Sequence, residues 1–282
     1  MRLGFSTNSI GDIDPQAAVP LLADLGYRSL AITLDHHLLN PFNRDTAAEA
    51  ARWKSLLAAH GMRCVVETGA RHLLDPEHKH EPTLVSADAT ARRRRSEFLV
   101  QAIDVATLLG ADCVSLWSGV VRDAAGEDEL WPRLTTSLAP VLEHAKSRGI
   151  AVGFEPEPGM FVDTLARFGI LLDRLGGPTH FRLTVDIGHL ICMGERPPAE
   201  ALRPWLGQIA NVHLDDMLAC RHDHLPLGAG EVDFGPVIAA LADAGFAGGL
   251  HVELPRQTHR WLATARESAA FLHHLLSERI LV

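Results

Sequence analysis

The chain has few of the features that mark secreted, membrane-bound or disulfide-rich proteins. Its 282 residues include only four cysteines, widely spaced and without a Cys-x-x-Cys motif, so we expect buried, reduced thiols. The N-terminal residues lack the apolar segment and cleavage site of a signal peptide. No apolar run approaches the ~18 residues of a membrane span. These absences predict a cytoplasmic protein without a membrane partner.

Positive charge is also scarce. There are 26 Lys and Arg residues against 35 Asp and Glu residues, which gives a formal net charge of −9. Since nucleic-acid affinity rests on Lys and Arg that neutralise phosphates, no nucleic-acid partner is expected. The conspicuous basic run at residues 92–95 is expected to be a solvated helix face. The hydrophobic share of 47% is typical of globular proteins and excludes a disordered chain.

The order of apolar segments predicts the fold. No Gly-x-Gly-x-x-Gly motif follows the first apolar run, which removes the main support for a dinucleotide-binding fold. Short apolar or β-branched runs alternate instead with amphipathic segments of helical period. The runs predicted as strands are residues 2–7, 27–33, 62–67, 112–118, 150–155, 181–186, 209–214 and 249–254. This alternation predicts an α/β protein, a (β/α)8 barrel, with residues 1–282 as a single domain.

The longest connection, residues 68–88, lies between the third and fourth predicted strands. In a barrel such a connection emerges on the face that carries the active site, and a long segment without regular structure is usually functional or mobile. It contains Arg71, His72, Lys79 and His80, which are placed to reach an anionic substrate. His72 is therefore a candidate substrate-binding residue, and a solvated loop is the alternative.

Four successive strands end in a carboxylate or an imidazole at an equivalent depth. These residues are Glu155, Asp186, His213 and Glu253. Burying three carboxylates together is unfavourable unless a cation compensates their charge. Three oxygen ligands and one nitrogen ligand favour Mn²⁺, Mg²⁺, Co²⁺ or Zn²⁺. The pattern predicts one divalent metal ion at this face of the barrel. The alternative is that the four residues are unrelated, exposed loop residues.

Several blocks of sequence resemble the xylose isomerase-like barrels. The blocks are residues 153–156, 185–189, 212–216, 227–234 and 252–253. That family includes sugar epimerases and isomerases, inosose-processing enzymes and endonuclease IV, and the resemblance extends over essentially the whole chain. It implies that Glu155, Asp186, His213 and Glu253 ligate the metal. It also implies that His189 contacts the substrate.

The resemblance implies a sugar isomerase or epimerase that works on a sugar or sugar-like polyol ketone. In the epimerase branch two glutamates, here Glu155 and Glu253, remove and return a proton through a metal-bound enediolate. Trp117 is a candidate wall of the site, with core packing as the alternative. The remaining candidate substrate-binding residues are His222, His224 and Arg256. For the two histidines, a role beside the metal ligands or a solvated loop position stays open.

Three other functions remain open. A lyase or dehydratase acting on an inosose- or dehydroshikimate-like substrate would use the same enediolate chemistry. An endonuclease IV-like phosphodiesterase would need three zinc ions, and Trp117 stands at the strand end where that branch has a histidine. A non-catalytic metal-binding barrel subunit would hold the metal without exchanging a substrate proton. A homo-oligomer is expected only by analogy with such barrels.

Overall fold

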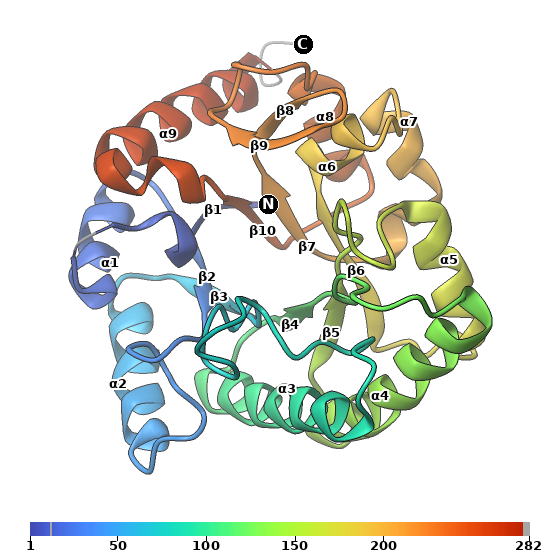
Figure 1. The fold of residues 1–282 in the computed structure, drawn as a ribbon. Coiled ribbons are helices and arrows are strands. Elements are labelled where there is room, and N and C mark those ends of the chain that lie inside the picture. The colour runs from blue at the N-terminus through green and yellow to red at the C-terminus, as the bar shows by residue number, and fades with distance from the viewer. Residues whose placement is uncertain (12, 279–282) are drawn as a thin grey trace. The chain divides into compact units, whose positions relative to one another are not determined.

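The computed structural model describes residues 1–11 and 13–278. Within them, eight strands form a closed barrel in the order β1-β10-β7-β6-β5-β4-β3-β2 (Figure 1). Their bounds are β1 Arg2–Ser6, β2 Ser29–Thr33, β3 Arg63–Glu67, β4 Cys113–Leu116, β5 Ala151–Phe154, β6 Phe181–Asp186, β7 Ile209–Leu214 and β10 Gly249–Val252. Each of the eight predicted strands is present, so the predicted (β/α)8 barrel is confirmed.

Helices follow the strands along the chain. Their bounds are α1 Pro15–Asp24, α2 Thr46–Ala59, α3 Ala89–Leu109, α4 Glu127–Arg148, α5 Leu165–Arg174, α6 Ile187–Cys192, α7 Pro198–Leu202, α8 Phe234–Asp243 and α9 Trp261–Glu278. Asp88 begins α3 by accepting hydrogen bonds from the backbone N–H groups of Thr90 and Ala91. Gly110 and Gly149 end α3 and α4 in the left-handed conformation, at φ +70° and +68°. These local signals explain where the helices start and stop.

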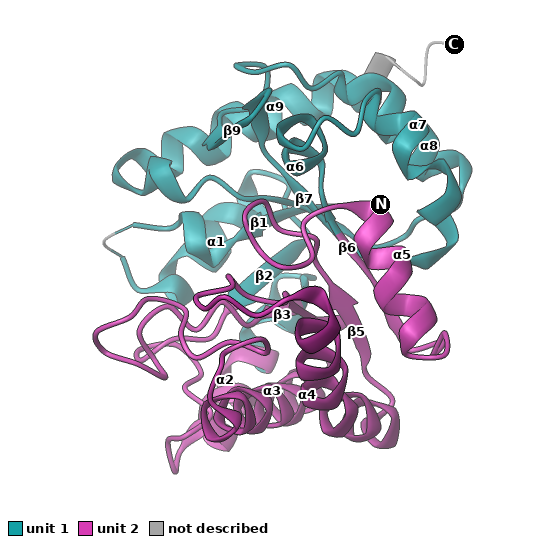
Figure 2. Cartoon of the chain, turned by 45° about the vertical axis from the view of Figure 1, so that its right-hand side comes forward, with its two compact units in different colours: residues 1–32, 55–64, 185–282 teal, residues 33–54, 65–184 magenta. Residues whose placement is uncertain are grey.

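The chain divides into two compact units, coloured separately in Figure 2. Unit 1 contains residues 1–32, 55–64 and 185–282, and unit 2 contains residues 33–54 and 65–184. The boundaries fall inside β2, α2, β3 and β6. The single domain expected from the sequence stays a prediction.

In unit 1, parallel pairing joins β2, β1, β10 and β7. The register makes Ser29 the partner of Gly4, Gly4 the partner of His251, and His251 the partner of His213. A polar row therefore crosses four neighbouring strands. The fully buried apolar residues of these strands include Phe5, Leu30, Val212 and Leu250.

Unit 1 also contains an antiparallel hairpin that the sequence did not predict. Its strands are β8, Asp216–Leu218, and β9, Arg221–Leu225. The β9 sequence Arg-His-Asp-His-Leu has almost no apolar residues, so it lacks the alternation that identifies a strand. The hairpin matters because it carries His222 and His224.

In unit 2, β3, β4, β5 and β6 pair in parallel. Its core includes the rings of Phe154, Phe168 and Phe181, whose centroids lie 5.7–6.3 Å apart. Residues 68–88 form no helix or strand, as the sequence predicted. The basic run at residues 92–95 differs from the expected solvated face, because Arg95 is fully buried. Its guanidinium lies 4.4 Å from the ring centre of Trp117.

No helix of the described residues combines the length and the apolar character needed to span a membrane.

Candidate functional site

Three of the predicted metal ligands come together in unit 1. Asp186, His213 and Glu253 each offer a ligand atom, and these atoms lie within 4.8 Å of one another. His213 Nδ1 is 3.1 Å from Glu253 Oε2. Asp186 is the last residue of β6, His213 lies near the end of β7, and Glu253 directly follows β10. The carboxyl ends of the strands place all three at one end of the sheet.

The Asp186 side chain has two different roles. Its Oδ1 accepts hydrogen bonds from the backbone N–H groups of Gly188, at 2.8 Å, and His189, at 3.3 Å, and so begins α6. Its Oδ2 is buried and accepts no hydrogen bond from the described residues. Burial opposes ionisation, but His189, His224 and His213 outweigh it, and the pKa of Asp186 lies below its ordinary value. This ionised oxygen accepts from no described N–H group, and His189 Nε2 lies 3.8 Å from it. A buried carboxylate with another carboxylate and imidazoles beside it fits a divalent cation.

The side chain of Glu253 is held by another residue of unit 1. The Asn8 side-chain amide donates a hydrogen bond of 2.9 Å to Glu253 Oε1. The carboxylate is partly exposed, at 16% of its side-chain surface. One oxygen is therefore fixed by Asn8, while the other faces His213.

Glu155, the fourth predicted ligand, belongs to unit 2. It directly follows β5, is buried, and its backbone N–H donates to the Leu116 carbonyl at 2.8 Å. Its approach to the three ligands of unit 1 stays a prediction.

A second group of side chains in unit 1 consists of three histidines. His189, His222 and His224 offer nitrogens within 4.8 Å of one another, and Nε2 of His189 lies 3.1 Å from Nε2 of His222. Burial lowers the pKa of His189 to about 3 and that of His222 to about 4, so both rings are neutral at pH 7. Neutral imidazoles can hold a substrate hydroxyl or a metal ion.

Two neighbouring aspartates, Asp215 and Asp216, support the histidine group differently. Asp215 is fully buried and its Oδ2 pairs with Nδ1 of His224. Burial, together with the charge of Asp186, raises the pKa of Asp215 well above its usual range. Asp216 is equally buried but accepts backbone N–H groups from Met217, Gly228 and Val232 at 2.9–3.0 Å. Asp216 therefore holds the hairpin, while Asp215 faces the site.

Arg256, a predicted substrate-binding residue, contacts the hairpin. Its Nη2 donates to the His222 carbonyl at 2.9 Å, and its Nη1 lies 3.2 Å from Asp223 Oδ1. The guanidinium is more than half exposed. A role in substrate binding stays a prediction for this residue.

The two predicted substrate-binding residues of unit 2 have different surroundings. His72 is exposed, and its carbonyl lies 3.3 Å from Nε2 of His36. Trp117 is buried, its ring contacts the guanidinium of Arg95, and the centroid of the His80 ring lies 5.6 Å away at an interplanar angle of 86°. These contacts belong to packing inside unit 2, and contact with a substrate stays a prediction for both residues.

Sequence reasoning missed the polar residues behind His213. Asn211, His251 and Ser29 are fully buried and joined by hydrogen bonds. Burial lowers the pKa of His251 to about 3. The available signal was spacing, because Asn211-x-His213 and His251-x-Glu253 place a polar residue two positions before a predicted ligand, on the same side of a strand.

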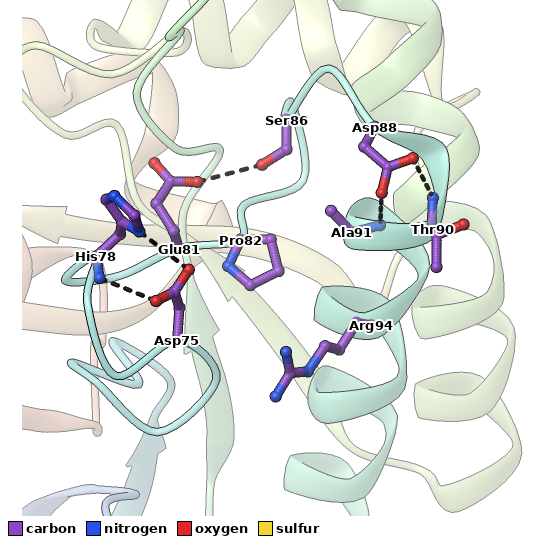
Figure 3. A pocket seen from close by; sticks show the side chains of 9 residues that line it. All are labelled: Asp75, His78, Glu81, Pro82, Ser86, Asp88, Thr90, Ala91 and Arg94. Atoms are coloured by element: carbon purple, nitrogen blue, oxygen red, sulfur yellow. Dashed lines mark hydrogen bonds and ion pairs between the residues drawn. The ribbon is translucent and has the colours of Figure 1, made fainter.

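Unit 2 also contains a cavity of about 430 Å³ beside the 68–88 connection (Figure 3). Its charged side chains are largely engaged with near neighbours. Asp75 pairs with His78 at 3.2 Å, Asp88 begins α3, and Glu81 accepts from Ser86 and Arg122, each at 3.2 Å. None of the predicted site residues lines this cavity.

Comparisons with known proteins agree with this architecture. A sequence model described as the xylose isomerase-like TIM barrel matches residues 19–275. The L-ribulose-5-phosphate 3-epimerase UlaE of Shigella flexneri serotype 5b is 26% identical over 220 residues, which covers 77% of this chain and 74% of the relative. An inosose dehydratase of Clostridium tetani is 28% identical over 153 residues, covering 47% of this chain and 50% of the relative.

Solved structures share the fold over almost the whole chain. An L-ribulose 3-epimerase structure superposes with a TM-score of 0.77 at 22% identity, covering 98% of this chain and 95% of the other. The IOLI protein, whose structure contains a bound zinc atom, gives a TM-score of 0.78 at 16% identity and covers 99% of both chains.

Proposed function

Because the chain belongs to the xylose isomerase-like TIM barrel family, we propose that it is a divalent-metal-dependent epimerase of a ketose or a ketose-like polyol. The observation that carries the proposal is the convergence of Asp186, His213 and Glu253 at the strand ends of unit 1. Sugar epimerases among the relatives support an enzyme of the isomerase and epimerase type. The choice of substrate within the ketoses is part of the proposal.

Asp186, His213 and Glu253 would hold one divalent ion, with Glu155 as the fourth ligand. When bound, the ion supplies a Lewis acid that polarises the substrate carbonyl and makes the neighbouring C–H group more acidic. The donor set of three carboxylates and one imidazole suits Mn²⁺, Mg²⁺, Co²⁺ or Zn²⁺. The buried Oδ2 of Asp186 accepts from no described N–H group. This supports the assignment, because a bound cation would offset the cost of burying the negative charge.

The protein groups would carry the proton. One of Glu155 and Glu253 takes the proton from the carbon beside the carbonyl, and the C–H electron pair moves to form an enediolate. The other glutamate returns a proton to the opposite side of the same carbon, which inverts its configuration. The neutral ring of His189 is suited to hold a substrate hydroxyl during the exchange. No redox partner is needed, since the proton lost is replaced.

Replacement of Glu155 by Gln tests the proton transfer. We expect Glu155→Gln to reduce deuterium uptake from D₂O into ketoses by about 10²–10⁴-fold, because the amide cannot accept the proton. Metal binding should survive in part, since the amide oxygen and three other ligands remain. Glu143→Gln, at an exposed position of α4, is the matched control. Exchange at the normal rate in Glu155→Gln would exclude Glu155 as a base.

A dehydratase is a second candidate, favoured by the inosose dehydratases among the relatives. The first proton abstraction would be the same, but a hydroxyl β to the carbonyl would then leave as water. Product analysis separates the two functions: an epimerase gives an isomer of unchanged mass, whereas a dehydratase gives a product lighter by one water.

The histidine group of unit 1 motivates a count of metal ions. One ion per chain supports the proposed epimerase. Three zinc ions would favour the phosphodiesterase considered from the sequence, and metal binding without any proton exchange would favour a non-catalytic subunit. Elemental analysis of protein purified without chelator, alongside the D₂O experiment, separates these outcomes. Association into a homo-oligomer stays a prediction.

A further inference from the structure

A chain of buried polar side chains leads away from His213 in unit 1. Asn211 Nδ2 lies 3.0 Å from His213 Nε2, and Asn211 Oδ1 lies 2.8 Å from His251 Nδ1. The other nitrogen of His251, Nε2, lies 2.8 Å from the Ser29 hydroxyl. At the opposite side of the His213 ring, Nδ1 faces Glu253 Oε2 at 3.1 Å. The series therefore connects a predicted metal ligand to β2 through three side chains.

Two glycines leave space for the His251 ring, the middle member of this series of polar side chains. Gly4 and Gly249 lie beside the His251 ring, and a Cβ atom at either position would come within 2.3 Å of a ring atom. A distance of 2.3 Å between a Cβ atom and a ring atom is far shorter than a van der Waals contact, so a larger residue at either position would displace the ring. Gly4 of β1 and Gly249 of β10 thus leave room for the imidazole of His251.

The atoms present define the direction of each hydrogen bond. A carbonyl oxygen only accepts, so His251 Nδ1 donates to Asn211 Oδ1, and the other nitrogen of this neutral ring accepts from Ser29. The amide nitrogen of Asn211 only donates, so His213 Nε2 accepts. The proton of a neutral His213 is consequently on Nδ1, the nitrogen that faces Glu253.

A cation beside Glu253 requires the opposite arrangement. To bind it, Nδ1 of His213 must offer a lone pair, and the ring proton must be on Nε2. Nε2–H then needs an acceptor, which Asn211 supplies if its amide turns by 180°. Its Nδ2 would then donate to His251 Nδ1, and His251 Nε2–H would donate to Ser29. Each hydrogen bond between these four side chains is kept and its direction is reversed.

We propose that Asn211 is a positioning residue which, with His251 and Ser29, selects the nitrogen of His213 that is free to bind the metal. The proposal rests on the proposed function in one respect, namely a cation at His213 and Glu253. Asparagine suits the role because its side chain offers a donor and an acceptor at equivalent positions. Aspartate can only accept, and leucine, of similar size, can do neither.

Zinc titration and histidine NMR test the proposal without using activity. The protein is labelled with ¹⁵N-histidine, the His213 signals are assigned with His213→Gln, and spectra are recorded with and without Zn²⁺. We expect the His213 proton on Nδ1 without zinc and on Nε2 with zinc. Asn211→Leu should weaken zinc binding by about 10–100-fold, as expected for loss of a partner behind a metal ligand. Asn211→Asp should lose less than about 10-fold in zinc affinity, because its carboxylate accepts from Nε2–H.

The outcomes are distinct. Wild-type zinc affinity in Asn211→Leu, or a His213 proton on Nε2 both with and without zinc, would overturn the proposal. If Asn211→Leu does not fold, Ser29→Ala replaces it: a smaller loss of affinity and a mixture of His213 tautomers are expected, and an unchanged spectrum contradicts the proposal. A wild-type protein that binds no zinc rejects this inference and the proposed metal site together. Zinc binding with the expected tautomers but no epimerisation rejects only the proposed function.

Discussion

The two compact units both bury charged side chains, but they provide for them differently. In unit 2, Arg133 is almost covered, and its guanidinium donates to Asp123 at 2.7 Å, to the Val85 carbonyl at 3.2 Å and to Glu129 at 3.1 Å. In unit 1, Oδ2 of Asp186 is buried and accepts no hydrogen bond from a described N–H group, and burial raises the pKa of Asp215 well above its usual range. A buried charge with a full set of partners supports the fold, whereas one without them favours a ligand or loses its charge. Hydrogen-bond partners, more than burial, distinguish scaffold from site.

The largest expected effect is at Asp186. Asp186→Asn should reduce divalent metal affinity by at least about 100-fold, because a charged ligand is lost from the site. The metal-free protein should lose little stability, because the amide oxygen can still begin α6 and removal of a buried charge offsets the lost attraction to His189, His224 and His213. Equilibrium dialysis with Zn²⁺ and urea unfolding of the metal-free protein measure the two effects.

Asp216 provides the matched control for this prediction. Asp216→Asn should lower stability by about 1–3 kcal/mol, because the amide group replaces one acceptor among three backbone hydrogen bonds. Metal affinity should change little. If both variants lose stability and metal together, the distinction drawn between these two aspartates is wrong.

Unit 2 contains two buried arginines, Arg133 and Arg95, that differ in their hydrogen-bond partners and so test the same comparison within one unit. Arg133→Met should lower the free energy of unfolding by about 1–2 kcal/mol, because it leaves the Val85 carbonyl and two carboxylates without their donor. Arg95→Met should be neutral or stabilising. Arg95 is fully buried, and burial lowers its pKa to about 9. Its Nη2 donates to the Thr68 carbonyl at 2.6 Å, but its Nε and Nη1 donate to no described residue.

Urea unfolding of the two methionine variants at pH 7.5 checks this pair. A loss for Arg95→Met as large as that for Arg133→Met would mean that contact of the guanidinium with Trp117 outweighs the cost of burying it. In that case the number of hydrogen-bond partners alone would not predict whether a buried arginine stabilises the fold.

The sequence was sufficient for the strands and for the side chains that come together at their ends, whose role as metal ligands stays a prediction. A barrel of this kind has a simple period, and Asp186, His213 and Glu253 stand where each strand stops, so local pattern and topology agree. The β8–β9 hairpin could not be predicted, because its strands are short and polar and depend on Asp216 for support. The burial of Arg95 was missed for a similar reason, since only the packing of Trp117 distinguishes it from its neighbours in the basic run.

Asn211 and His251 show a second limit of the sequence. Their spacing places them on the same face as the predicted ligands, but their role depends on which atoms meet across β7 and β10. Pairing between strands is set by register, and register is not visible in either strand alone. The position of Glu155 relative to the three ligands of unit 1 is likewise a matter of topology, and it stays a prediction.

The smallest expected effect concerns His80 in the 68–88 connection. Its Nδ1 donates to the Gly69 carbonyl at 2.6 Å, and burial lowers its pKa to about 4. Because the unfolded chain has the ordinary pKa of 6.5, it binds more protons than the folded state between about pH 4 and 6.5, so stability falls as pH drops through that window. Since the ring is partly exposed, we expect a loss of only about 1 kcal/mol between pH 7.5 and 5.

His80→Asn isolates this contribution, since asparagine tolerates the left-handed backbone at φ +70° and does not titrate. Unfolding in urea at both pH values gives the difference between the variant and the wild-type protein, in which the other buried histidines cancel. The variant should lose about 1 kcal/mol less on acidification. Equal losses would mean that the connection opens before the protein unfolds and that His80 titrates there as an exposed residue. The partnered charges of unit 2 would then stabilise its helices while leaving the 68–88 connection free to open.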